Sequence, residues 1–261
     1  MKTTIDPLFL QIATEAARKA GKYQLEQLGK ITIREKNPGD VVTEADIESQ
    51  KIIFSLLSGH FPEHSLLGEE SGENQTDWRK GYCWIVDPID GTKNFVHGLP
   101  SFSVSIALFL DGEPVVGVVY DPMLDELFTA ELGNGARKNG RPIGPSECVE
   151  LRRSLLVCSF PSVVTSETPE LARFVNVVQK ASLRRLGSAA LNLCYVASGR
   201  LDGYWASTLN IWDVAAGALI VLEAGAVLRG LDGTPFSFLD CRLAATSTDR
   251  LNQELVPLLD V

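Results

Sequence analysis

The residues Asp87-Pro88-Ile89-Asp90-Gly91-Thr92 combine two acidic groups with a glycine and a hydroxyl, directly after the apolar run Trp84-Ile85-Val86. The apolar run is typical of a buried strand, so the two carboxylates are expected where that strand finishes. Carboxylates bind hard cations such as Mg²⁺, and free backbone N–H groups with a hydroxyl at a helix start hold phosphate. The motif therefore indicates a metal-assisted phosphate site. Asp-Pro and Asp-Gly are also ordinary turn dipeptides, and Thr92 suits a helix cap, so a purely structural turn stays open.

A second acidic group, Glu69-Glu70, follows another short apolar run upstream. An isolated Glu-Glu pair is usually a solvated turn. Together with Asp87 and Asp90, however, it would place four carboxylates at adjacent strand ends, where they repel one another strongly unless cations lie between them. We therefore interpret the set as a metal site, provided that the two strand ends lie side by side.

Asp213 belongs to a third segment, at the start of a helix that is rich in small residues. N-capping is the default role of an aspartate in this position. Because Ala215, Ala216 and Gly217 let the helix pack close to a neighbour, Asp213 could instead complete a metal site built by the other part of the chain. Asp46 is ambiguous in a similar way, since Thr43 followed by Asp46 approximates a capping box and a structural role competes with a catalytic one.

The elements that must position these residues differ between the two parts of the chain. Apolar periodicity predicts helices over residues 7–28 and 43–57, and strands at 65–67, 82–87, 103–110, 115–120 and 126–130. Beyond residue 154, strands (155–159, 183–186, 202–205, 226–228) alternate with helices (169–181, 188–197, 214–224, 251–259). This order predicts an N-terminal α+β half, residues 1–150, that binds metal and phosphate, and a C-terminal α/β half, residues 151–261, that completes the site.

Composition and charge narrow the class of protein. The chain has 261 residues, a net charge of −9 and 45% hydrophobic residues, as in ordinary soluble globular proteins. Its acidic balance argues against a nucleic-acid polymer or a membrane surface as the main partner. Five scattered cysteines without a C-x-x-C pair indicate free thiols rather than a zinc site or disulfides. With no signal-peptide core and no apolar run near the roughly 20 residues of a membrane span, a cytoplasmic location is expected.

Three separated segments, Gly68-Glu69-Glu70, Asp87–Phe95 and Trp212–Gly217, resemble in this order the signatures of the inositol monophosphatase family, a Mg²⁺-dependent, lithium-sensitive type of phosphatase. Any one signature alone would be weak evidence, whereas three in the right order are highly specific. The similarity covers nearly the whole chain and continues through Lys36, Asp40-Val41-Val42-Thr43, Asp46, Gly117–Pro122, Gly135–Gly140 and Gly187–Ala190.

The resemblance implies a layered α-β-α-β-α sandwich, like that of inositol monophosphatase and fructose-1,6-bisphosphatase, and usually a homodimer. The Mg²⁺ ligands that it implies are Glu69, Asp87, the carbonyl of Ile89, Asp90 and Asp213. The implied substrate contacts are Asp90, Gly91, Thr92, Gly187, Ser188, Ala189, Ala206 and Asp213. By the same resemblance Glu70, Asp46 and Thr92 orient or help deprotonate the attacking water. Such chemistry needs no nucleophilic side chain, because a metal ion lowers the pKa of its water and neutralises phosphate oxygens.

The expected function is therefore hydrolysis of a small polyol or sugar phosphate, such as inositol monophosphate, by metal-activated water. One departure bears on the substrate: inositol-preferring members carry a glutamate seven positions before the late aspartate, where this chain has Ala206 and lacks that acceptor for a polyol hydroxyl. Histidinol phosphate, fructose 1,6-bisphosphate and 3′-phosphoadenosine nucleotides remain alternative substrates, and Lys93 is compatible with the nucleotide and histidinol phosphatase relatives. A non-enzymatic role as a metal-bound regulatory partner also stays open.

Two basic residues near these motifs have structural alternatives. His97 is interpreted as a structural residue, because hard cations prefer oxygen ligands. Lys36 either supports the acidic site electrostatically or is a solvated surface lysine.

Overall fold

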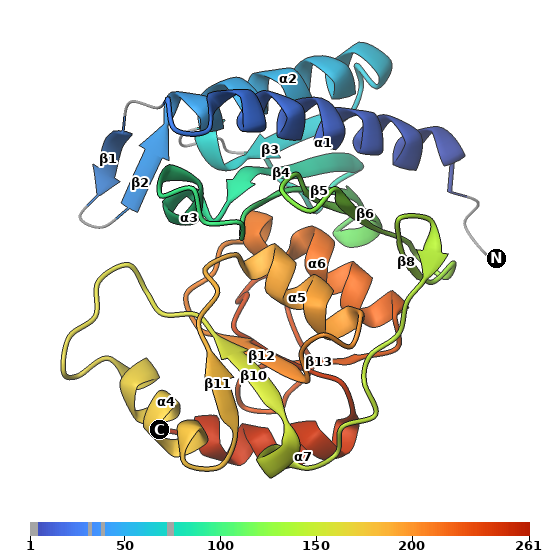
Figure 1. Cartoon of the computed structure of the whole chain (residues 1–261). Coiled ribbons are helices and arrows are strands. Elements are labelled where there is room, and N and C mark those ends of the chain that lie inside the picture. The colour runs from blue at the N-terminus through green and yellow to red at the C-terminus, as the bar shows by residue number, and fades with distance from the viewer. Residues whose placement is uncertain (1–4, 31–32, 38–39, 72–75) are drawn as a thin grey trace.

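Helix and sheet layers alternate in an α-β-α-β-α order in a computed structural model of the chain (Figure 1). The structure describes residues 5–30, 33–37, 40–71 and 76–261, with the side chains of 33–37 and 40–41 outside the description. Helices α1 (Pro7–Gln27) and α2 (Glu44–His60) cover the outer face of a seven-stranded sheet. Helices α5 (Ala189–Ala197) and α6 (Ile211–Glu223) lie between that sheet and a five-stranded one, whose far face is covered by α4 (Pro169–Val178) and α7 (Asp249–Leu259). The layered sandwich predicted from the sequence is confirmed.

The seven-stranded sheet brings two of the acidic segments to one edge. Its first two strands, β3 (Ser65–Gly68) and β4 (Tyr82–Asp90), pair in parallel, with Gly68 opposite Val86. Glu69 therefore leaves β3 beside the end of β4 that carries Asp87 and Asp90, and the two strand ends do lie side by side. The other strands are antiparallel and follow in chain order: β5 (Ser103–Leu110), β6 (Glu113–Asp121), β7 (Glu126–Glu131), β8 (Ala136–Lys138) and β9 (Arg141–Pro142).

The five-stranded sheet is mixed. Strand β10 (Leu155–Cys158) is parallel to both of its neighbours, β11 (Ser182–Arg184) and β12 (Gly203–Ala206). Strand β14 (Leu243–Thr246) lies antiparallel between β12 and β13 (Val227–Arg229). The remaining elements are a hairpin of β1 (Ile33–Asn37) and β2 (Asp40–Thr43), the short helix α3 (Thr92–Val96) and the 3₁₀ turns η1 (Glu69–Ser71) and η2 (Leu151–Arg153).

Small residues let α6 approach the seven-stranded sheet closely. A Cβ added to Gly117 of β6 would lie 2.9 Å from the carbonyl oxygen of Ala216. The apolar character all round α6 fits its place between two sheets, where both of its faces are buried. At its start, the carbonyl oxygen of Trp212 accepts a hydrogen bond from Ser105 Oγ of β5 at 3.4 Å. This hydrogen bond holds the first turn of α6, with Asp213, over the edge of the seven-stranded sheet.

Several predicted bounds were wrong. Strand β4 runs on to Asp90 instead of ending at Asp87, although its pairing with β5 changes register between these two residues. Helix α4 ends at Val178, and α6 begins three residues earlier than predicted, at Ile211. The division into residues 1–150 and 151–261 stays an interpretation: the sheets separate between Pro142 and Leu155, but α5 and α6 pack against both. None of the described helices has the length and apolar character that crossing a membrane requires.

Candidate metal and phosphate site

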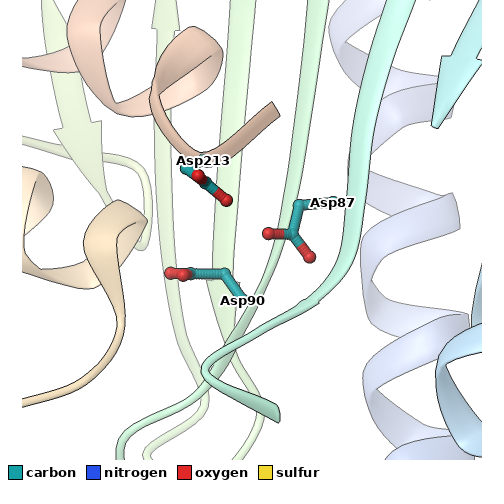
Figure 2. Close-up of side chains that lie close together, drawn as sticks. All are labelled: Asp87, Asp90 and Asp213. Atoms are coloured by element: carbon teal, nitrogen blue, oxygen red, sulfur yellow. The ribbon is translucent and has the colours of Figure 1, made fainter. Parts of the chain in front are cut away.

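Three carboxylates from distant parts of the chain converge at the edge of the seven-stranded sheet. Asp87 and Asp90 come from β4, and Asp213 comes from the first turn of α6. One oxygen from each lies within 4.8 Å of the others, and Figure 2 shows the three side chains gathered around a common space. The register change between Asp87 and Asp90 accounts for the shared direction, because residues three apart on a regular strand would point to opposite faces.

Asp87 is the carboxylate of the group whose negative charge the protein compensates least. Its side chain is 2% exposed, and its Oδ1 atom has no hydrogen-bond partner among the described residues. Burial raises the pKa of Asp87 well above its usual value, and the charges of Glu69, Asp90 and Asp213 raise it further. An unpartnered carboxylate oxygen in the protein interior is destabilising unless a cation compensates it.

Asp90 is held by the N-terminus of α5. Its carboxylate accepts hydrogen bonds from the backbone N–H groups of Ala189 (3.0 Å) and Ala190 (2.8 Å), from Ser188 Oγ and, at 3.4 Å, from Ser103 Oγ. Burial raises the pKa of Asp90, while these donors, led by Ser188, act in the opposite direction. The contact fixes the orientation of Asp90 and ties the end of β4 to the second half of the chain.

Asp213 stabilises the start of its own helix and also belongs to the carboxylate group. The expected N-cap role was wrong, because Asn210 is the N-cap; Asp213 is the third helical residue, and its Oδ2 atom accepts the backbone N–H of Asn210 at 2.7 Å in a capping box. Glu69 and Glu70 are half-buried in η1 and lie outside the group of three. The negative charge of Glu69 nevertheless raises the pKa of Asp87. The charge density at this edge thus extends beyond the three converging carboxylates.

The residues present fit a hard divalent cation. Carboxylates are the ligands that Mg²⁺ prefers, and the backbone carbonyl of Ile89 lies between the two aspartates of β4 in the sequence. A bound cation would compensate both the mutual repulsion of the carboxylates and the unpartnered oxygen of Asp87.

Asp46 and Thr92 connect the capping box of α2 to the candidate phosphate loop (residues 91–94). Asp46 Oδ2 accepts the backbone N–H of Thr43 at 2.7 Å and the Thr43 hydroxyl at 2.6 Å, which confirms the capping box. Its other oxygen, Oδ1, lies 3.2 Å from Thr92 Oγ1, which is also 3.0 Å from the Ile89 carbonyl oxygen. Burial raises the pKa of Asp46 to about 6, although the hydrogen bonds from Thr43 lower it. The structural and the chemical interpretation of Asp46 are therefore compatible.

Gly91 and Asn94 shape the loop. Gly91 adopts φ +94°, and a Cβ there would lie 2.9 Å from the Ser101 carbonyl oxygen and 3.3 Å from that of Gly187. A side chain at Gly91 would thus be strained in both backbone and packing. Asn94, which the sequence interpretation did not single out, donates from Nδ2 to the carbonyl oxygens of Ser101 (2.6 Å) and Leu186 (2.7 Å). Its partners lie 7 and 92 residues away in the sequence. The only sequence signal for this role of Asn94 was its position within the Asp87–Phe95 motif.

The other predicted site residues are spread around this centre. Ser188 and Ala189 contact Asp90, as described, and Gly187 precedes them in the segment that faces Asn94. Ala206 lies at the end of β12 with no exposed area, packed in the core. His97 is exposed at the C-terminus of α3 and does not belong to the group of three carboxylates. The side chain of Lys36 lies outside the described residues.

Comparison with known proteins assigns the family. The sequence profile of the inositol monophosphatase family matches residues 8–260. The chain is 42% identical over 254 residues to an inositol-1-monophosphatase from Synechocystis, covering 95% of this chain and 87% of that protein. It is also 42% identical over 229 residues to the Nus factor SuhB from Vibrio cholerae, covering 86% of this chain and 85% of that one.

Solved structures agree with the sequence relatives. An inositol monophosphatase from Anabaena (Nostoc) matches with a TM-score of 0.86 at 41% identity, over 97% of this chain and 95% of that one. The extragenic suppressor protein suhB from Bartonella henselae matches with a TM-score of 0.90 at 38% identity, over 97% and 98% of the two chains. The chain belongs to the inositol monophosphatase family.

Proposed function

We propose that this protein is a Mg²⁺-dependent phosphomonoesterase that hydrolyses a small polyol or sugar phosphate such as inositol monophosphate. The observation that carries the proposal is the group of Asp87, Asp90 and Asp213 within 4.8 Å, with a buried carboxylate oxygen that lacks a partner among the described residues. The names of several relatives as inositol monophosphatases support the same activity.

In this proposal Mg²⁺ is held by the carboxylates of Glu69, Asp87, Asp90 and Asp213 and by the Ile89 carbonyl. When bound, the metal supplies an acidified water and neutralises charge on the phosphate. The protein contributes a fixed geometry, because the α5 N-terminus holds Asp90 and the Asn210 backbone holds Asp213. Preorganised ligands of this kind avoid the free-energy cost of rearranging charged groups during the reaction.

The proton of the attacking water is handled by Thr92 and Asp46. The Thr92 hydroxyl accepts a hydrogen bond from water while donating its own proton to Asp46 Oδ1, 3.2 Å away. Glu70 assists through its charge, which raises the pKa of Asp46. The backbone N–H groups of Gly91 and Thr92 hold the phosphate in this arrangement.

The departing alcohol faces the segment from Gly187 to Ala189, with Asp213 beside it. Because Ala206 is buried and offers no acceptor, a polyol gains no charged hydrogen bond at this position. Histidinol phosphate, fructose 1,6-bisphosphate and 3′-phosphoadenosine nucleotides therefore belong in the same test.

The experiment is phosphate release from a panel of these monoesters, with Mg²⁺ and with EDTA. We expect turnover only with Mg²⁺, and its loss in Asp90→Asn, which retains the shape of the side chain but removes its charge. Wild-type protein that hydrolyses none of the compounds, or an Asp90→Asn variant that remains active, would contradict the proposal. Asp232→Asn, an exposed aspartate hydrogen-bonded to Thr234 far along the chain, is the matched control and should retain full activity.

A second candidate is a regulatory role in complex with another macromolecule. Relatives named Nus factor SuhB are as similar to this chain as the named phosphatases are. Affinity capture of a stable partner, combined with undetectable hydrolysis, would favour this role over the enzymatic one. We also propose a cytoplasmic homodimer, which light scattering of the purified protein and fractionation of cells would test.

A further inference from the structure

A pocket of about 420 Å³ opens beside the phosphate loop. Its walls come from the loop itself (91–94), from the end of β10 and the segment after it (158–162), and from the segment before α5 (185–187). Of the described residues that line it, two, Lys93 and Arg185, are cationic, and none is acidic. In a chain with a net charge of −9, and next to converging carboxylates, this is an abrupt local reversal of charge.

The two cations are available to a ligand. The Arg185 guanidinium lies over the Phe160 ring, 4.9 Å from its centroid, and stacking of this kind leaves the N–H groups in the guanidinium plane free to donate. Lys93 is exposed and directly follows Thr92 in the first turn of α3. Among the described residues, no carboxylate pairs with either cation, so both charges face solvent in the pocket.

The pocket is also continuous with the reaction site proposed above. Gly91, Thr92 and Gly187 line it, and Gly187 directly precedes Ser188, which contacts Asp90. A molecule whose phosphate lies at the loop therefore extends into the pocket with its remaining atoms. A volume of 420 Å³ lies within the range of small-metabolite sites.

We propose that Lys93 and Arg185 bind a second anionic group, a phosphate or a carboxylate, on the same substrate molecule. The preferred substrates are then small phosphomonoesters that carry another anionic group a few bonds from the reacting phosphate. This inference rests on the proposed function, because the pocket opens onto the same loop. Both cations line the pocket, whereas the carboxylate group supplies the metal ligands, so both act on substrate selection: Arg185 binds the second anion through two parallel N–H groups, and Lys93 binds it as a point charge.

The test compares matched substrates, fructose 1-phosphate with fructose 1,6-bisphosphate and 2′-AMP with adenosine 2′,5′-bisphosphate. In the wild-type protein we expect a higher kcat/KM for the doubly anionic member of each pair. Removing one charged hydrogen-bonding group in Arg185→Ala or Lys93→Ala should lower that kcat/KM about tenfold, mainly through KM, and change the singly anionic member by less than about twofold. Arg185→Lys should recover part of the loss. Arg184→Ala removes the exposed neighbour that does not line the pocket and should leave both substrates unaffected.

The outcomes separate this inference from the proposed function. Equal kcat/KM for both members of each pair, or equal losses on both in Arg185→Ala and Lys93→Ala, would overturn the second-anion site while leaving the phosphatase activity intact. A wild-type protein that hydrolyses inositol monophosphate but none of the four compounds with Mg²⁺ would overturn this inference alone. A wild-type protein that hydrolyses none of the monoesters in either panel would overturn the phosphatase activity and this inference with it.

Discussion

Replacing Asp87 with asparagine should stabilise the metal-free protein. Asp87 is buried, its Oδ1 lacks a partner among the described residues, and neighbouring carboxylates raise its pKa. Asparagine has nearly the same shape and cannot ionise. The substitution therefore removes the repulsion without creating a cavity.

The magnitude follows from the spacing of the carboxylates. Two unit charges separated by 4.8 Å repel by about 3.5 kcal/mol at an effective dielectric constant of about 20. Partial protonation of the cluster reduces this repulsion, so we expect Asp87→Asn to raise the free energy of unfolding in EDTA by about 2–3 kcal/mol near neutral pH, or Tm by roughly 5–10 °C.

The pH dependence has a definite sign. Because the pKa of Asp87 is higher in the folded than in the unfolded chain, its destabilising effect is absent below the unfolded value near 3.8 and grows as pH rises through the folded value. The metal-free wild-type protein should therefore lose stability relative to Asp87→Asn as pH rises from about 4 toward neutrality. Below pH 4 the two proteins should converge.

Thermal and urea unfolding in EDTA and in Mg²⁺ provide the assay. Mg²⁺ at about 100 times its Kd should stabilise the wild-type protein by about 2.7 kcal/mol and Asp87→Asn by much less, while the variant loses activity. The control is Asp121→Asn, another buried aspartate with a raised pKa that lies outside the carboxylate group and should respond to Mg²⁺ like the wild type. An Asp87→Asn variant that is no more stable in EDTA, or that retains the full response to Mg²⁺, would refute the reasoning.

Three further predictions concern the supports of the site. Gly117→Ala should destabilise the fold by about 1–3 kcal/mol in urea unfolding and raise the Mg²⁺ concentration needed for activity, because the new Cβ meets the Ala216 carbonyl at 2.9 Å and displaces α6. Asn94→Ala should lower the free energy of unfolding by about 2–3 kcal/mol in the same assay, because two hydrogen bonds to backbone carbonyls are lost. Asn94→Asp should be destabilised at least as much, because a carboxylate cannot donate to these carbonyls. If ionised Asp46 accepts the proton, its pKa of about 6 predicts that kcat/KM falls about tenfold per pH unit below pH 6. An Asp46→Asn variant whose pH profile keeps the same slope would contradict this role.

Local signals were sufficient for much of the fold. Asp6 and Pro7 mark the start of α1, and Thr43 with Asp46 mark the start of α2. Strand β14 was missed because Leu243-Ala244-Ala245-Thr246 has little intrinsic preference for a strand, and its pairing with β12 and β13 determines its conformation. The continuation of β4 to Asp90 was missed for a related reason, since Pro88 marks a turn in the sequence whereas here it lies within a register change of a paired strand.

The sequence predicted which acidic residues form the candidate site, but not which residues hold them in place. The positions of the acidic residues at expected strand ends made them candidates for one site, because carboxylates that lie close together repel one another unless a cation binds between them. It could not show that the α5 N-terminus holds Asp90, because Ser188, Ala189 and Ala190 lie 98 to 100 residues beyond it. The pocket with Lys93 and Arg185 was hidden in the same way, since tertiary packing alone brings those residues to the wall of one pocket.

The three carboxylates differ in how the protein satisfies them, and this difference indicates where a cation contributes most. Asp213 is hydrogen-bonded within its own helix, and Asp90 is held by the start of a helix from the other half of the chain. Asp87, the most buried of the three, has an oxygen with no donor among the described residues. Asp90 and Asp213 are therefore positioned before any ion binds, whereas Asp87 depends on the ion for compensation. Removing the charge of Asp87 should consequently give the largest gain in metal-free stability, while the same change at Asp90 or Asp213 also weakens a hydrogen bond that the fold uses.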